Sequence, residues 1–73
     1  MVIIEGHTDS TGSFEHNKEL SLRRARSVRD EFVRQGIDKD RIKYEGFAYK
    51  KPIDTNETIS GRAANRRTEV VVK

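Results

Sequence analysis

The sequence predicts an α/β (α+β) fold, a two-layer sandwich in which a small mixed sheet is packed by one main helix. Three observations lead to this prediction. Short β-branched runs stand near both ends of the chain, with an alternating stretch between them, and the residues after the first run repeat apolar side chains at helical spacing. The chain has 73 residues, which is enough for one domain with a modest core. We therefore expect residues 1–73 to form a single domain.

The first predicted strand covers residues 2–5, an apolar and β-branched run that stops at Gly6. The next seven residues, 7–13, hold one glycine, four hydroxyl residues and Asp9. Residues of these types bind their own backbone and favour turns. A loop is therefore predicted after the strand, in a position where ligand sites are common.

The main helix is predicted to begin at Asn17, which can act as its N-cap, or one turn later at Ser21. Gly36 is predicted to close it. Between these ends, apolar residues recur every three or four positions and form one stripe, while charged residues occupy the other faces. The stripe consists of Leu22, Ala25, Val28 or Arg29, and Phe32.

The second half of the chain is predicted to add two strands. Residues 42–47 alternate between two faces in the manner of a strand with one covered side. Residues 48–58 contain the only proline, Pro52, and are predicted to form a surface loop. A single helical turn is predicted for 61–67, and the last strand for 68–72.

Composition excludes several classes of protein. The chain has no cysteine, so disulfides and thiolate metal sites are impossible. No segment approaches the roughly 18 apolar residues of a membrane-spanning helix. A net charge of +3 would suit a polyanionic partner, but acidic residues are interspersed throughout the sequence. Composition alone therefore does not predict a nucleic-acid partner.

Four segments occur in the order and approximate spacing of a known family. They are Gly-His-Thr-Asp-Ser-Thr-Gly at 6–12, Asn17, Leu-Ser-Leu-Arg-Arg-Ala at 20–25, and Gly-Arg-Ala-Ala-Asn-Arg-Arg at 61–67. Together they resemble the OmpA-like family of peptidoglycan-binding domains, which includes the C-terminal domains of OmpA proteins, peptidoglycan-associated lipoproteins and MotB stators. Family domains begin with a further strand and helix, so the resemblance implies a domain that lacks these two elements and is truncated at its N-terminus.

The resemblance also implies a function. By analogy with the family, Asp9 and Arg24 bind the meso-diaminopimelate of the peptidoglycan stem peptide, and Thr11, Asn17 and Arg66 line the same pocket. The protein would then anchor the outer membrane or an envelope complex to the cell wall. It would lie in the periplasm of a diderm bacterium, and its parent protein would be attached to a membrane outside this chain.

The chemistry of diaminopimelate fits the two principal residues. Its free end carries an ammonium and a carboxylate on one carbon, so a selective pocket needs an anion and a cation close together. Asp9 is expected to bind the ammonium. Arg24 is expected to bind the carboxylate, because a planar guanidinium can donate two parallel hydrogen bonds.

Other hypotheses compete with this one. Without the family motifs, Asp9 would be interpreted as a turn-stabilising residue and Arg24 as a solvated helix arginine. The arginine-rich helix could instead bind nucleic acid, and an open sheet edge could pair with a second copy to give a homodimer. His7 and His16, together with Asp9, are a weak metal signal, so no metal or cofactor is predicted. His7 is expected to be a hydrogen-bonded structural residue. No nucleophile motif is present, and no catalysis is expected.

Overall fold

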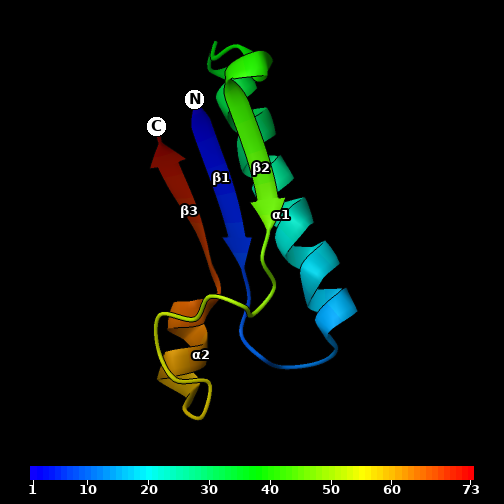
Figure 1. The fold of residues 1–73 in the computed structure, drawn as a ribbon, viewed down its shortest axis with the longest axis vertical. Coiled ribbons are helices and arrows are strands. Elements are labelled where there is room, and N and C mark those ends of the chain that lie inside the picture. Colours follow the sequence, from blue (N-terminus) through cyan, green and yellow to red (C-terminus); the bar gives the residue numbers. More distant parts are fainter.

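The computed structural model describes all residues, 1–73, and confirms the predicted sandwich of a small mixed sheet and one main helix. Its elements in chain order are β1 (Val2–His7), α1 (Phe14–Arg34), a 3₁₀ turn η1 (Lys39–Arg41), β2 (Ile42–Gly46), α2 (Ile59–Asn65) and β3 (Arg67–Val72). Figure 1 shows β1 at the centre of the sheet. It runs parallel to β2 and antiparallel to β3.

The start of α1 differs from the prediction. The helix begins at Phe14, three residues before Asn17, and the predicted starts at Asn17 and Ser21 are wrong. Ser13 is the N-cap, and its hydroxyl accepts a hydrogen bond from the backbone N–H of His16 at 3.2 Å. At the other end Gly36 has a φ of +99°, so it closes the helix as predicted.

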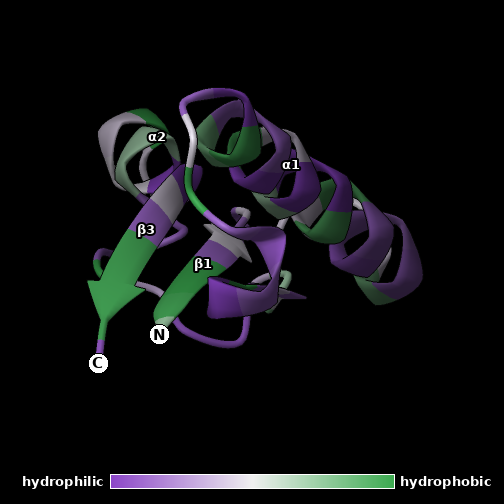
Figure 2. Ribbon diagram, turned by 90° about the horizontal axis from the view of Figure 1, so that it is seen from above, coloured by the Kyte–Doolittle hydropathy of each residue, from purple (hydrophilic) through white to green (hydrophobic).

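The core lies between α1 and the two parallel strands. Ile4 of β1, Ala25 of α1 and Ile42 of β2 are buried together, and partly buried apolar side chains surround them. The predicted apolar stripe of α1 is only partly covered, because Leu22 is exposed at its edge. Figure 2 shows the helix from above, with hydrophobic and hydrophilic bands alternating along it. No helix is both long and apolar enough to span a bilayer.

Two glycines bring the backbone of α1 against the sheet. A Cβ on Gly6 would lie 2.0 Å from the carbonyl oxygen of Ser21, and a Cβ on Gly46 would lie 2.6 Å from the nitrogen of Leu22. The Ser21 hydroxyl also accepts a hydrogen bond from the backbone N–H of Ala48 at 3.1 Å. This close contact fixes the height and rotation of the helix relative to the end of β1.

The loops that follow β1 and β2 and the short helix α2 lie at one end of the sheet. There the chain leaves β1 and β2 and enters β3, and α2 lies beside these connections (Figure 1). The predicted loop at 48–58 is confirmed. The helical turn predicted at 61–67 is displaced, because α2 begins two residues earlier, at Ile59, and ends at Asn65. His7 belongs to β1 and not to the loop, which begins at Thr8. The termini meet at the opposite end, where the N-terminal ammonium of Met1 donates to the carbonyl oxygen of Lys73.

Candidate functional site

The loop after β1 holds Asp9 in a fixed orientation. The Asp9 side chain is largely buried, and its Oδ1 accepts a hydrogen bond from the backbone N–H of Thr11 at 2.9 Å. Short-range bonds of this type explain why the loop turns at this residue. The Thr11 amide, with a further contribution from the Arg66 guanidinium, holds the pKa of the Asp9 carboxyl below its ordinary value. Asp9 is therefore an anion at neutral pH.

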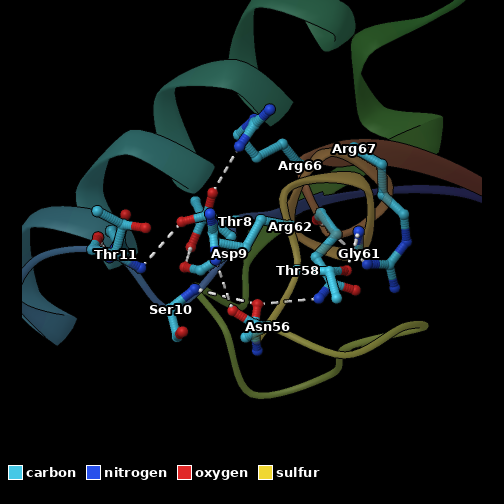
Figure 3. A network of polar contacts seen from close by, with 12 residues as sticks. Thr8, Asp9, Ser10, Thr11, Asn56, Thr58, Gly61, Arg62, Arg66 and Arg67 are labelled. Carbon is cyan, nitrogen blue, oxygen red and sulfur yellow. Dashed lines mark hydrogen bonds and ion pairs between the residues drawn. The ribbon is translucent and has the colours of Figure 1, made fainter.

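The second oxygen of Asp9 binds Arg66, not Arg24. Arg66 Nη1 donates to Asp9 Oδ2 at 2.7 Å, and Figure 3 shows the arginine reaching across to the loop. Arg66 caps the C-terminal end of α2 and immediately precedes β3. Since β3 is antiparallel to β1, its first residues lie beside the last residues of β1. The topology therefore joins two motifs that lie far apart in the sequence.

Arg24 lies in a hollow next to this pair. The hollow has a volume of about 320 Å³ and is lined by Arg24, Arg66, Arg67 and Thr68. Arg24 is exposed and takes part in none of the ion pairs of the protein. Arg66 lines the hollow and also binds Asp9, so it connects the two residues that were expected to share a ligand.

Asn17 and Thr11 contribute to the loop in different ways. The buried Asn17 side chain donates to the carbonyl oxygens of Thr11, at 2.7 Å, and of Ser13, at 3.1 Å. It therefore fastens the loop to the first turn of α1. Thr11 itself is exposed and is held through its backbone groups.

Sequence reasoning missed the residues that support the site from the other side. Asn65 is completely buried, and its side chain accepts from the backbone N–H groups of Ile53 and Asp54 and donates to Asn56. Asn56 Oδ1 in turn accepts from the backbone N–H of Ser10 at 3.3 Å (Figure 3). Asn65 belongs to the Gly-Arg-Ala-Ala-Asn-Arg-Arg motif at 61–67. The sequence does not show that its side chain binds the loop at 48–58.

Arg67 and Thr68 were also missed as lining residues. Arg67 donates to the carbonyl oxygens of Lys51, at 2.9 Å, and of Asn65, at 3.3 Å. These bonds hold its guanidinium at the edge of the hollow. Three guanidinium groups around one open hollow, with a carboxylate beside them, suit a ligand that carries a carboxylate and an ammonium.

Comparison with known proteins identifies related sequences. A model of the OmpA family matches residues 1–66, which confirms the resemblance indicated by the motifs. Outer membrane porin F of Pseudomonas aeruginosa is 44% identical over 71 residues, which are 96% of this chain and 20% of the porin. Peptidoglycan-binding protein ArfA of Mycobacterium tuberculosis is 46% identical over 71 residues, which are 97% of this chain and 22% of ArfA.

Solved structures share the fold. The crystal structure of the peptidoglycan-associated lipoprotein from Burkholderia pseudomallei superposes with a TM-score of 0.91 at 28% identity. The match covers 96% of this chain and 59% of the lipoprotein chain. The present chain spans about a fifth of the length of the two curated relatives named above.

Proposed function

This chain belongs to the OmpA family, and on that basis we propose that it binds peptidoglycan non-covalently through the diaminopimelate of the stem peptide. Two kinds of relative support the proposal, a protein named for peptidoglycan binding and a lipoprotein named for its association with peptidoglycan. The observation that carries it is the unpaired guanidinium of Arg24 in a hollow beside the Asp9–Arg66 ion pair.

Each charged group of the ligand has a partner of opposite charge in this arrangement. The carboxylate of diaminopimelate would enter the hollow and accept two hydrogen bonds from Arg24. The ammonium would lie toward Asp9. Each oxygen of Asp9 has one protein donor and keeps a second lone pair for the ligand. Arg66 holds the Asp9 carboxylate in place and adds positive charge on the carboxylate side.

The proposed role in the cell follows from this binding. A domain that holds the stem peptide would anchor the outer membrane, or an envelope complex, to the cell wall. The protein would therefore lie in the periplasm and be attached to a membrane through other parts of its parent protein. Porin F, named as an outer membrane protein, is a relative with such a location.

The helix itself gives little support to the nucleic-acid alternative. Of its arginines, Arg23, Arg29 and Arg34 each form an ion pair with an acidic residue of the same helix. A phosphate backbone would have to compete with these carboxylates.

Sedimentation with purified diaminopimelate-type peptidoglycan tests the proposal. We expect Arg24→Ala to weaken binding about 10- to 100-fold, because charge-assisted hydrogen bonds are lost. Arg24→Lys should also weaken it, since an ammonium cannot donate in the same paired geometry. Arg23→Ala is the matched control, because Arg23 is the adjacent exposed arginine and lies outside the hollow. Equal binding by the Arg24 and Arg23 variants would contradict the assignment.

A second comparison identifies the ligand group. Peptidoglycan with lysine in place of diaminopimelate lacks the extra carboxylate, so binding should be lost. Free diaminopimelate should compete with the diaminopimelate-type wall, and Asp9→Ala should abolish binding while the circular dichroism spectrum stays that of a folded protein. Retained binding to the lysine-type wall would show that the carboxylate is not recognised.

A further inference from the structure

The face of the sheet opposite α1 carries a row of three glutamates. Successive side chains of a strand point to opposite faces, and Ile4 of β1 packs on α1, so Glu5 points to the open face. Its neighbours in register are Glu45 of β2 and Glu69 of β3. Like charges directly opposite each other on adjacent strands are destabilising. The row would therefore be stabilised by a bound cation.

His7 lies beside this row and lacks the hydrogen bonds expected of it. Only 1% of the side chain is exposed, and neither ring nitrogen has a hydrogen-bond partner, so the prediction of a hydrogen-bonded structural histidine is wrong. Its Nε2 lies 3.4 Å from Glu5 Oε1 and 3.5 Å from Glu69 Oε2. A buried polar atom without a partner is costly and calls for an explanation such as an ion.

The two distances from His7 Nε2 match the geometry of a metal ion. With bonds of about 2.1 Å, two ligands of a tetrahedral zinc ion lie about 3.4 Å apart. The ligand atoms of Glu5, His7 and Glu69 all lie within 4.8 Å of one another. From this geometry we propose that these three residues bind a divalent ion of the zinc type, with water as the fourth ligand.

The surroundings hold the ligands in place. The ring of Phe47 stacks on that of His7 with centroids 5.3 Å apart, which fixes the plane of the imidazole. Arg67 Nε lies 3.2 Å from Glu69 Oε1 and leaves Oε2 facing His7. The positive charge of Arg67 opposes a cation, but the two carboxylates outnumber it. Glu69 is 45% exposed, so the ion has a path from solvent.

Such an ion would join β1 to β3 and offset the repulsion between their glutamates. This set of ligands could not be predicted from the sequence. Glu5 and His7 are close in the chain, but Glu69 belongs to the last strand. The metal site considered from the sequence consisted of the two histidines and Asp9, which is a different group.

Calorimetric titration of the metal-free 73-residue chain with zinc chloride tests the proposal. One equivalent of zinc should bind, and Glu69→Gln should weaken the affinity at least about tenfold. Glu45→Gln is the matched control, because Glu45 stands in the same row but outside the three-residue cluster. Failure of the wild-type chain to bind zinc, or equal affinity in the Glu69 and Glu45 variants, would overturn the proposal.

A measurement on the unmodified chain avoids the risk that a variant misfolds. In nuclear magnetic resonance spectra, zinc should shift the ring nitrogen signals of His7 and leave those of the exposed His16 unchanged. Shifts confined to His16 would place the ion elsewhere. Peptidoglycan binding can be measured in the same samples, and its loss or retention does not affect the interpretation of the zinc titration.

Discussion

The carboxylate of Asp9 shows what a single residue does in this protein. One oxygen binds the amide of Thr11 within its own loop, and the other binds Arg66, which immediately precedes the last strand. The same side chain therefore shapes the loop after β1 and joins it to the segment between α2 and β3. Its remaining lone pairs are the ones available to a ligand.

Asn65 allows a test of stability alone, because it has no proposed contact with the ligand. Asn65→Ala removes the acceptor of two backbone N–H groups, those of Ile53 and Asp54. We expect a loss of about 2 to 3 kcal/mol in the free energy of unfolding, because part-buried donors lose their partner. Urea denaturation followed by circular dichroism measures this loss.

The matched control for Asn65 is Ser60→Ala, an exposed position on the same helix. It should change the free energy of unfolding by less than about 0.5 kcal/mol. A small effect of Asn65→Ala, similar to that of the control, would show that the bonds of Asn65 contribute little to stability.

At the residue scale, local features could be predicted from the sequence, but little of the long-range pairing could. A turn at Asp9 could be predicted from the residues around it. The ion pair between Asp9 and Arg66 could not, because it depends on the antiparallel alignment of β1 and β3. The resemblance to the OmpA-like family predicted that Arg24 and Arg66 line one pocket. Why these two side chains lie close together can be seen only in the folded chain.

At the scale of elements, the contact between α1 and the sheet depends on space at Gly6. Gly6→Ala would place a methyl group 2.0 Å from the carbonyl oxygen of Ser21, which is a backbone atom. We expect the free energy of unfolding to fall by about 3 kcal/mol or more, which is at the upper end of the effects of overpacking. Thermal or urea denaturation measures the change.

Gly36→Ala is the comparison variant, because it should lower the free energy of unfolding through backbone strain and not through a steric clash. A Cβ at Gly36 would meet no atom within 4 Å, but its φ of +99° strains any residue that has a side chain. The expected loss is about 1 to 2 kcal/mol. A loss at Gly6 no larger than that at Gly36 would show that α1 can move away from the sheet at little cost.

The elements themselves were largely predictable, since each rests on a local pattern. The start of α1 could not be predicted correctly. Asn17 and Ser21 are residue types that often cap helices, but here their side chains make tertiary contacts. Asn17 binds the loop and Ser21 binds Ala48. A capping preference cannot be distinguished from a tertiary contact in one sequence.

At the scale of the whole molecule, β3 leaves one edge of the sheet unpaired. Val70 and Val72 on this strand are 46% and 76% exposed. Exposed apolar edge strands tend to pair with other chains. We expect the apparent mass in light scattering to rise with protein concentration, and Val70→Lys to suppress this rise. A monomer at every concentration would count against the homodimer that the sequence suggested.

The order of the strands also governs when the fold can form. Within residues 1–73 β1 comes first, whereas its antiparallel neighbour, β3, comes last. Before β3 is available, β1 can pair only with β2. The pairing of β1 with β3 joins residues as far apart as Val2 and Val72, and pairings between distant segments form slowly. Residues 67–72 are therefore expected to join the sheet last, after β1, β2 and α1 have formed the core of Ile4, Ala25 and Ile42.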